Sequence, residues 1–370
     1  MELGGNCSAL IFSKVLIMFI VNTSCISPQL SYDLRLLTLG KVEHLLGNKY
    51  EALEPPYAKL IPEDLLPQMG KVVRMGAGVG MTLLKQADKE EKRVEGLIIG
   101  SANGATDKVA NFLIEENVEL PLLPDDVVDT APNAVARTLA ALGNVNGYNN
   151  THISRGLAFE RALLDAFAQF ETTEIERLLL GAVDKLSAVD FDKEEQKGMF
   201  KPAQDTHSEN LLRSNTPGTV AGEGAVFFML EREYSTDAKA RIIDAEQFDF
   251  SSLDDLTERA ELFLTKNGMT THDIDVLFLG YNGDNRNSPY YDHLYRKLFE
   301  NTGVYTFKNL VGEYHTASAF AMWLAANLLG GQTMPRHAIW TPVPRRVKRV
   351  LIYNNYEGAQ HGFILLKRPW

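Results

Sequence analysis

The stretch GYNNTHISRGLAFERALLDAFAQF, Gly147 to Phe170, decides the fold of this chain. Its second part, Leu157 to Phe170, has the length of a helix and contains neither Gly nor Pro. The apolar side chains that cover most of its helical wheel are Leu157, Phe159, Leu163, Leu164, Phe167 and Phe170. A helix that is apolar nearly all round lies buried among other elements. The stretch therefore predicts a central, buried helix.

A polar run, Asn149 to Arg155, precedes this helix. Its hydroxyl, amide and imidazole side chains can cap a helix, and the same residue types can take part in catalysis. The N-terminus of a buried helix stabilises an anion and offers free backbone N–H groups to an oxyanion. The run is therefore either a helix cap without chemistry, which is the commoner use of such residues, or the place of a nucleophile.

Composition narrows the class of protein. The chain has 370 residues, of which 45% are hydrophobic, so it can bury one large core or two medium ones. The formal net charge of -11 argues against nucleic acid as the main partner. The two cysteines, Cys7 and Cys25, are too few and too close together for a disulfide framework or a zinc site. We therefore predict no metal centre.

The apolar run from Ala9 to Val21 has two interpretations. It could be the core of a signal peptide, with Cys25 as a lipoprotein cysteine, although Ser13 and Lys14 interrupt it. We prefer the second interpretation, a buried first strand over Val15 to Val21 that the residues NTSCISP end. Residues 1–14 are then a leader or an unstructured N-terminus.

The two halves of the chain repeat one order of elements. In the first half, the strand GLIIG (Gly96 to Gly100) enters a polar loop, and the strand RLLLG (Arg177 to Gly181) follows the central helix. In the second half, DVLFLG (Asp275 to Gly280), the apolar helix Thr316 to Leu329 and the strand VLIY (Val350 to Tyr353) follow in the same order. The repetition predicts a five-layered α-β-α-β-α sandwich with a pseudo-two-fold axis and both buried helices in its middle layer.

Three other segments carry weaker signals. Lys71 to Leu84 is rich in glycine but lacks the strand and the GKS or GKT of a phosphate-binding loop, so close helix packing is the expected use of its glycines. Asp126 to Leu142 is typical of a helix, and Asp190 to Asn215 of a polar surface loop or cap. We place the two halves of the chain at residues 15–245 and 246–370.

Several motifs, taken in order, resemble the β-ketoacyl-ACP synthases of the thiolase superfamily. They are PNAVARTLAALGNVNG (Pro132 to Gly147), LLLGAVD (Leu178 to Asp184), GTVAGEGAVFFMLE (Gly218 to Glu231) and KNLVGEYHTASAFA (Lys308 to Ala321). The resemblance runs with gaps from about Val15 to Lys367. It implies a thiolase-like fold, a dimer, and an acyl chain delivered on the phosphopantetheine of an acyl carrier protein, with no other cofactor.

The resemblance also implies a cysteine at the start of the central helix, where it takes the acyl chain as a thioester. No cysteine lies after Cys25, and Ile153 and Ser154 align near the nucleophile. A serine could be acylated only with an adjacent base, because its hydroxyl is much harder to deprotonate than a thiol. His152, two residues away, and His315, from the second half, are the candidate bases.

Two family histidines, which serve decarboxylation and stabilise the enolate and oxyanion, are also missing. The first would fall at Gly280 or Tyr281, and Glu313 stands where the second is expected. Lys308 and Gly312 match the family motif outright. The side chains that the resemblance places around a remaining substrate pocket are His152, Tyr281, Asn282, Glu313 and Asn355.

Two interpretations of the catalytic candidates Ser154, Lys308 and His315 stay open. In the first, they support acyl transfer or condensation, with Ser154 in place of cysteine. In the second, Ser154 caps the helix, His152 and His315 are hydrogen-bonded turn residues, and Lys308 pairs with a carboxylate such as Glu313. We prefer the second, because a working constellation needs all of its groups in place at once.

We therefore expect a ketosynthase-like subunit of fatty-acid or polyketide biosynthesis, the aryl-polyene pigment type among them, that does not itself condense. Like the chain-length factors that it resembles, it would form half of a dimer, with itself or with a paralogous ketosynthase. The alternative is an active 3-oxoacyl-ACP synthase or acyltransferase that uses Ser154, and a more distant one is a secreted lipoprotein of unrelated role. The preferred function implies a cytoplasmic protein without a membrane span.

The densest basic cluster, Arg345, Arg346, Lys348 and Arg349, comes directly before the strand VLIY. Acyl carrier proteins are acidic, so a chain with a net charge of -11 would bind one through a local basic patch. The strand leads to Asn355, which aligns near the glycine-rich loop at the mouth of the family's active site. We hypothesise that the cluster docks a carrier protein or an acidic partner subunit; the alternative is a solvated charged face.

Overall fold

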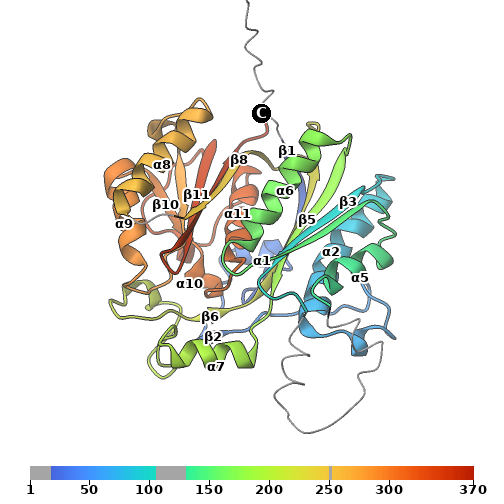
Figure 1. Cartoon of the computed structure of the whole chain (residues 1–370), viewed down its shortest axis with the longest axis horizontal. Helices are drawn as coiled ribbons and strands as arrows, with labels where there is room; N and C mark the ends of the chain where they lie inside the picture. Colours follow the sequence, from blue (N-terminus) through green and yellow to red (C-terminus); the bar gives the residue numbers. More distant parts are fainter. Residues whose placement is uncertain (1–17, 106–130, 250–251) are drawn as a thin grey trace, which may run out of the picture.

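The computed structural model describes residues 18–105, 131–249 and 252–370, and its main feature is one ten-stranded sheet (Figure 1). The strand order is β10-β9-β11-β12-β8-β1-β7-β5-β3-β4. The strands of the first half are β1 (Met18–Ile26), β3 (Gly96–Ser101), β4 (Tyr148–Ile153), β5 (Arg177–Asp184) and β7 (Gly224–Glu231). Those of the second half are β8 (Ala240–Asp249), β9 (Val276–Leu279), β10 (Gly303–Thr306), β11 (Arg349–Tyr356) and β12 (Gln360–Lys367).

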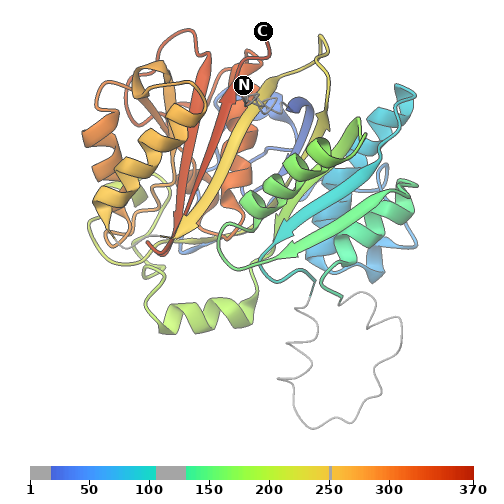
Figure 2. The same cartoon turned by 45° about the horizontal axis from the view of Figure 1, so that its top comes forward.

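The two halves meet at a narrow seam in the centre of this sheet. There β1 and β8 pair antiparallel from Met18↔Ile242 to Ile20↔Ala240. Outward from the seam, the strands follow the orders β1-β7-β5-β3-β4 and β8-β12-β11-β9-β10. Counted along the chain within each half, both orders place the first strand at the seam, followed by the fifth, fourth, second and third. The predicted pseudo-two-fold repeat is therefore confirmed. Figure 2 shows the two groups of strands diverging from the seam.

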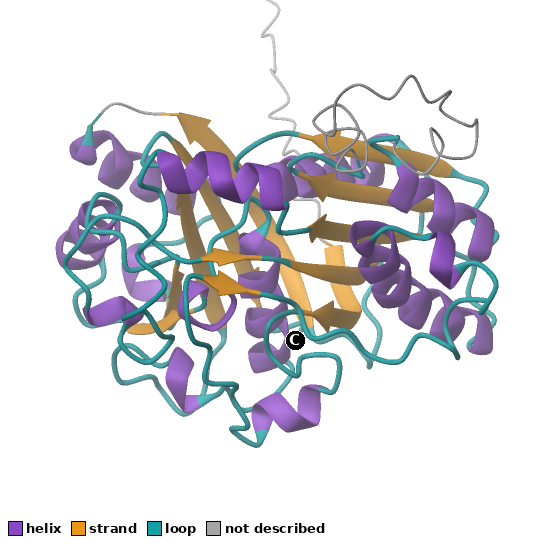
Figure 3. Ribbon diagram, turned by 90° about the horizontal axis from the view of Figure 1, so that it is seen from below, coloured by secondary structure: helices purple, strands orange, loops and turns teal. Residues whose placement is uncertain are grey.

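Helices form three layers around and between the two groups of strands (Figures 1 and 3). The outer helices are α2 (Lys71–Lys89) and α5 (Ala134–Leu142) on the first half, and α8 (Leu253–Lys266) and α9 (Ser288–Leu298) on the second. The middle layer holds α6 (Ala158–Thr172) and α11 (Ala317–Leu329). One large hydrophobic cluster corresponds to each layer of helices, because each sheet half buries apolar side chains on both faces. The predicted five-layered sandwich is confirmed.

The two middle helices differ in how completely they are buried. All residues of α11 except Leu328 are buried, as its composition predicts. Helix α6 buries Phe159, Leu163 and Phe170, but Leu164 stays 37% exposed. One side of the stretch that decides the fold is therefore open to solvent. No helix within the three described ranges is both long and apolar enough to cross a bilayer.

The glycines of α2 serve close helix packing, as predicted. A Cβ atom at Gly80 would lie 2.5 Å from Cδ2 of Leu139 on α5, and one at Gly76 would collide with Val135 of the same helix. Because Gly76 and Gly80 have no side chains, α2 and α5 can approach each other closely. A phosphate-binding loop is excluded here, because the glycines lie inside a regular helix.

Several element boundaries differ from the sequence predictions. The lead-in to the central helix is strand β4, and α6 begins at Ala158. Strand β1 runs through the polar residues that were expected to end it and reaches Ile26. Residue 245, the expected end of the first half, falls within β8. Within the described residues, the predicted helix Asp126 to Leu142 is helical only as α5. The sequence also predicts a helix over Asp107 to Glu116, and that segment lies outside the described residues.

Shorter elements complete the described part of the chain. They are α1 (Leu34–Thr38), β2 (Lys49–Tyr50), α7 (Ala188–Gln196), β6 (Ala221–Gly222), α10 (Lys308–Val311) and the 3-10 helices η1 (Leu66–Gln68), η2 (Leu211–Arg213), η3 (Thr271–Asp273) and η4 (Arg336–Ala338). Helix α7 lies in the segment that was expected to be a polar surface loop or cap.

The N-terminal strand bears on the lipoprotein alternative. Cys25 lies inside β1, paired with Val226 of β7, and only 1% of its surface is exposed. Burial raises the pKa of its thiol to about 12. A lipidated N-terminal cysteine could not occupy this position in the centre of a sheet. Residues 1–14, the expected leader, lie outside the described residues.

Candidate functional site

A small cleft lies where α6 and α11 begin, beside the carboxyl ends of β5 and β11. It consists of two adjoining cavities of about 100 and 80 Å³. The residues that line both are Glu194, Phe200, Glu313, Tyr314 and His315. Sites for small molecules usually measure about 300–1,000 Å³. The cleft between the described residues is therefore too small to enclose a long acyl chain.

The turn between β4 and α6 is where the family resemblance places a nucleophile. Gly156 and Leu157 both adopt left-handed backbone conformations, with φ of 56° and 53°. A strained strand–turn–helix connection of this kind can expose a nucleophile in α/β enzymes. Here the non-glycine residue in the left-handed conformation is Leu157, which is fully buried and carries no reactive atom.

Ser154 is not placed for catalysis or for helix capping. Its hydroxyl donates a hydrogen bond to the carbonyl of Arg155 at 3.2 Å, and Leu157 occupies the N-cap position of α6. The expectation that Ser154 caps the helix is therefore wrong. Nε2 of His152 lies 2.8 Å from Oδ2 of Asp165, and among the described residues neither His152 nor His315 hydrogen-bonds to Ser154.

His315 reaches across the pseudo-two-fold axis to this turn, as expected. Its Nδ1 accepts a hydrogen bond of 3.0 Å from the backbone N–H of Gly156. Because Nδ1 acts as the acceptor, the proton of the neutral ring is on Nε2. The ring also packs against Tyr356, with 4.6 Å between ring centroids. His315 thus holds the turn at the start of α6 in place.

The space for the first family histidine is filled by other groups. A Cβ atom at Gly280 would lie 2.6 Å from Oδ1 of Asn354 and 2.6 Å from the hydroxyl of Tyr291. Tyr281, the other aligned position, points away, since its hydroxyl donates to Asp292 on the outer helix α9 at 2.6 Å. An imidazole therefore does not fit at position 280 without a change in its surroundings, and the side chain at position 281 is directed toward α9.

Lys308 and Glu313 form an ion pair, as the structural interpretation predicts. Lys308 is fully buried, and its Nζ lies 2.8 Å from Oε2 of Glu313. Lys308 also donates to the carbonyl of Asn355 at 3.3 Å, and the amide of Asn282 donates to Oε2 of Glu313 at 2.7 Å. The carboxylate that replaces the second histidine is thus held by a lysine and an amide.

Asp184, at the end of β5, was not singled out from the sequence. Its buried carboxylate accepts hydrogen bonds from Ser101 Oγ and Ala102 N, at 3.1 and 2.7 Å. It also accepts from the backbone N–H and hydroxyl of Thr316, at 3.0 and 2.8 Å. Burial raises the pKa of Asp184. A carboxylate at the end of a buried strand, in LLLGAVD, was the signal for this link between the halves.

Glu160 is a second group that the sequence analysis missed. It lies in the first turn of α6, fully buried beside Ser318 of α11 and Gly362 of β12. Within the described part of the chain, neither carboxyl oxygen makes a hydrogen bond of acceptable geometry, although the Ser318 hydroxyl is close enough to offset part of the burial effect. Burial raises the pKa of Glu160 to about 7. An acidic residue in the first turn of a helix that was predicted to be buried was the signal.

The other expected pocket residues have separate surroundings. Asn282 and Glu313 line the cleft, whereas His152 binds Asp165 beside the sheet edge and Tyr281 packs under α9. Asn355 is buried beneath Lys308. His152, Tyr281 and Asn355 therefore do not line the cleft.

The basic cluster lies away from the cleft. Arg345, Arg346 and Lys348 are exposed, and Arg349 pairs with Asp273 at 3.5 Å. They sit at the start of β11, whose 8 residues span about 23 Å before the cleft at its other end. The strand thus leads from the cluster to the cleft, as expected, while the cluster itself lies at the far end of β11. Carrier docking by this cluster stays a prediction.

Comparison with known proteins places the fold. No family model matches the sequence, and no curated protein is significantly similar to it. Solved structures match across 95% of the chain. The ishigamide ketosynthase/chain length factor has a TM-score of 0.76 at 13% identity, with 99% of its chain covered. A β-ketoacyl synthase from Burkholderia phymatum STM815 has a TM-score of 0.73 at 13% identity, also with 99% covered.

A ketosynthase in complex with its chain length factor, from Xenorhabdus doucetiae, matches with a TM-score of 0.72 at 14% identity and 98% coverage. The predicted resemblance therefore holds at the level of the structure. The chain has the thiolase-like fold that ketosynthases and chain length factors share.

Proposed function

We propose that this protein is a non-condensing, chain-length-factor-like subunit that pairs with a ketosynthase in fatty-acid or polyketide biosynthesis. One observation carries the proposal: each position that would hold a reacting group holds a packing or ion-paired group instead. Leu157 occupies the strained turn, Tyr291 and Asn354 fill the space beside Gly280, and Glu313 is bound to Lys308. An acyl carrier protein as the source of the acyl chain, and the cytoplasm as the location, are parts of the same proposal.

The two edges of the ten-stranded sheet support a paired subunit. The edge at β10 is covered, since Trp340 N–H donates to the carbonyl of Val304 at 2.9 Å and Val304 N–H donates to Thr341 Oγ1 at 2.8 Å. No comparable bond from another described segment covers the outer edge of β4. Ile153 on β4 and Leu164 on α6 are also exposed there, by 42% and 37%. An open strand edge with apolar neighbours suits strand pairing with a second subunit.

The register of β4 identifies the groups available for such pairing. Tyr148 N–H donates to Glu95 O at 3.0 Å, and Ser154 N–H donates to Ser101 O at 3.1 Å. Backbone groups alternate in direction along a strand, so the N–H groups of Asn149, Thr151 and Ile153 point away from β3. Their outward direction makes them the donors for a strand of the partner.

Thr151→Pro is expected to abolish dimer formation with little effect on folding. Proline removes one outward N–H and is tolerated on an edge strand whose N–H faces away from its own sheet. We expect the dimer dissociation constant to rise at least about 100-fold, measured by light scattering and sedimentation. Thr151→Val is the matched control, because it keeps the N–H and the branched side chain and should remain dimeric.

Two results would contradict this interface. One is a Thr151→Pro protein that dimerises like the parent. The other is a parent chain that stays monomeric at micromolar concentration both alone and mixed with a cysteine-bearing ketosynthase of the same organism. A folded monomer of the proline variant, with parental circular dichroism, would support the proposal directly.

The chain is expected to remain unacylated when it is incubated with acyl carrier proteins loaded with acyl chains. The turn before α6 holds no activated thiol, and its serine is not hydrogen-bonded to a general base, so no group there can take the acyl chain. Intact-mass spectrometry should show the unmodified mass, while a cysteine-bearing ketosynthase in the same reaction gains the acyl mass. An adduct that maps to Ser154 and disappears in Ser154→Ala would instead establish the acyltransferase alternative.

A further inference from the structure

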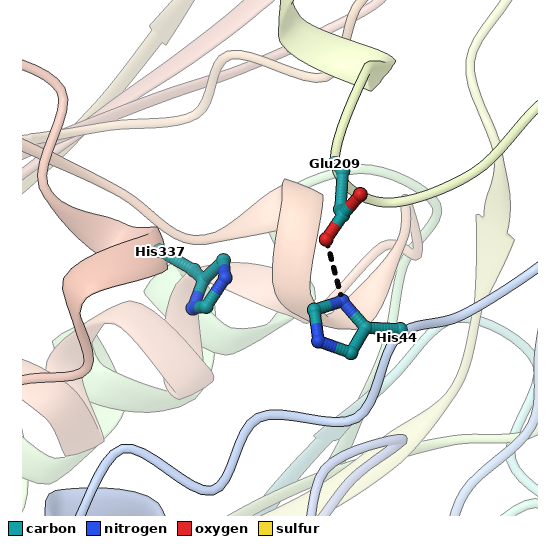
Figure 4. Close-up of side chains that lie close together, drawn as sticks. All are labelled: His44, Glu209 and His337. Atoms are coloured by element: carbon teal, nitrogen blue, oxygen red, sulfur yellow. Dashed lines mark ion pairs between the residues drawn. The ribbon is translucent and has the colours of Figure 1, made fainter.

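Two histidines and a glutamate from three distant segments meet at the surface (Figure 4). His44 lies between α1 and β2, Glu209 lies shortly before η2, and His337 lies in η4. Nδ1 of His44 is 2.9 Å from Oε1 of Glu209, and the two imidazole rings are 5.6 Å apart between centroids. One ligand atom from each residue lies within 4.8 Å of the other two.

The backbone that carries these side chains is held by hydrogen bonds. The segments of His44 and Glu209 are joined where Ser208 N–H donates to Leu45 O at 2.9 Å and Leu45 N–H donates to Ser208 Oγ at 3.1 Å. The carbonyl of His337 accepts from the amide of Asn309 at 2.9 Å. The segments of His44 and Glu209 therefore keep their relative positions, and that of His337 is fixed on α10, so a small turn of the side chains is what closes the set.

This combination of ligands selects a particular class of cation. Two neutral imidazoles and one carboxylate suit Zn²⁺ and neighbouring transition metals, whereas Ca²⁺ and Mg²⁺ prefer oxygen ligands. Ligand distances of about 2.0–2.2 Å around Zn²⁺ place ligand atoms roughly 3.3 Å apart. The side chains of His44 and Glu209 are 59% and 57% exposed and are free to rotate. Rotations that move the ligand atoms by about 1 Å bring them to the spacing that Zn²⁺ requires.

We propose that His44, Glu209 and His337 bind one Zn²⁺ ion, with water completing the coordination. An ordinary surface ion pair accounts for His44 and Glu209 alone, but the edge-to-face approach of His337, at 82° between ring planes, supplies a third ligand. The ion joins two segments of the first half, one before β2 and one before η2, to a segment of the second half. Bound Zn²⁺ therefore acts as a clip between the halves and stabilises the folded state by mass action. This inference is independent of the proposed function.

The test uses the full-length chain without a histidine tag, stripped of metal with a chelator and dialysed. Titration with Zn²⁺ followed by calorimetry and elemental analysis should give one ion per chain, bound at micromolar concentration or tighter, with a rise in Tm. The variants His44→Gln, Glu209→Gln and His337→Gln should each bind at least tenfold more weakly. His272→Gln, which changes an exposed histidine on η3, is the matched control and should bind like the parent.

The exposed positions of His44, Glu209 and His337 mean that the variants should fold like the parent without metal. Their metal-free Tm values serve as that check. Substoichiometric uptake by the parent would overturn the proposal, as would parental affinity in the double variant His44→Gln/His337→Gln. Co²⁺ provides a separate readout, since its visible absorption should report a protein-bound, low-coordinate site in the parent and lose that signal in the double variant.

Discussion

Lys308→Met should lower the free energy of unfolding by about 3–5 kcal/mol, the usual cost of removing one partner from a buried ion pair. The substitution leaves Glu313 and the carbonyl of Asn355 without the ammonium that binds them. Denaturant unfolding monitored by circular dichroism measures the loss. Lys348→Met, which changes an exposed lysine, is the matched control and should shift the free energy of unfolding by no more than about 0.5 kcal/mol.

A double-mutant cycle separates the ion pair from other effects of the Lys308 substitution. Adding Glu313→Gln to Lys308→Met removes the uncompensated charge but keeps a group that Asn282 can donate to. The double variant should therefore recover a large part of the lost stability, with a coupling energy of about 1–3 kcal/mol. A stable Lys308→Met protein, or a double variant as unstable as the sum of the single ones, would refute the structural role that we assign to this pair.

Glu160→Gln should stabilise the protein more at high pH than at low pH. Burial raises the pKa of the Glu160 carboxyl from its usual 4.5 to about 7 in the folded chain. Between these values the folded chain holds one proton more than the unfolded chain, so the contribution of Glu160 to stability falls as pH rises from 4.5 to 7 and is constant above that. Over this pH range, the ionisation of Glu160 lowers the free energy of unfolding by about 3 kcal/mol in total.

Glutamine stays neutral across this range, so the gain from Glu160→Gln should grow by about 2–3 kcal/mol between pH 5 and pH 8. Comparing the two pH values cancels any constant cost of burying the amide. Denaturant midpoints at each pH measure the difference. Glu171→Gln, at the exposed end of the same helix, is the control and should give the same small effect at both values. A stability gain for Glu160→Gln that did not depend on pH would show that Glu160 is not the ionising group.

The sequence predicts the layers of this fold because apolar periodicity is a local property. The runs LIIG and LLLG, and the all-round apolar helix α11, bury both faces or every side, so their composition alone indicates a central place. Strand β4 was missed because its residues, YNNTHI, lie at a sheet edge and are only partly buried. An edge strand needs few apolar side chains, and this one therefore has the composition of a turn.

The candidate site was harder to predict, because its decisive contacts join distant parts of the chain. The pairing of Lys308 with Glu313 spans only a few residues and could be anticipated. The filling of the space beside Gly280 by Tyr291 and Asn354, and the bonds of Asp184 to Thr316, depend on how the halves pack. Neither leaves a pattern in the local sequence.

The position of β1 has a consequence for how the chain folds during synthesis. Strand β1 is made first among the described strands, yet its partners are β7 and β8, and Phe19 pairs with Glu231. At about 5–20 residues per second, the ribosome needs roughly 10–40 s to make the chain between them. During that interval a strand carrying Met18, Ile20 and Ile26 has no sheet to join, and long-range pairing of this kind folds slowly. The nascent protein thus presents an unpaired, partly apolar strand early, and such a strand is prone to aggregate until the middle of the sheet can close.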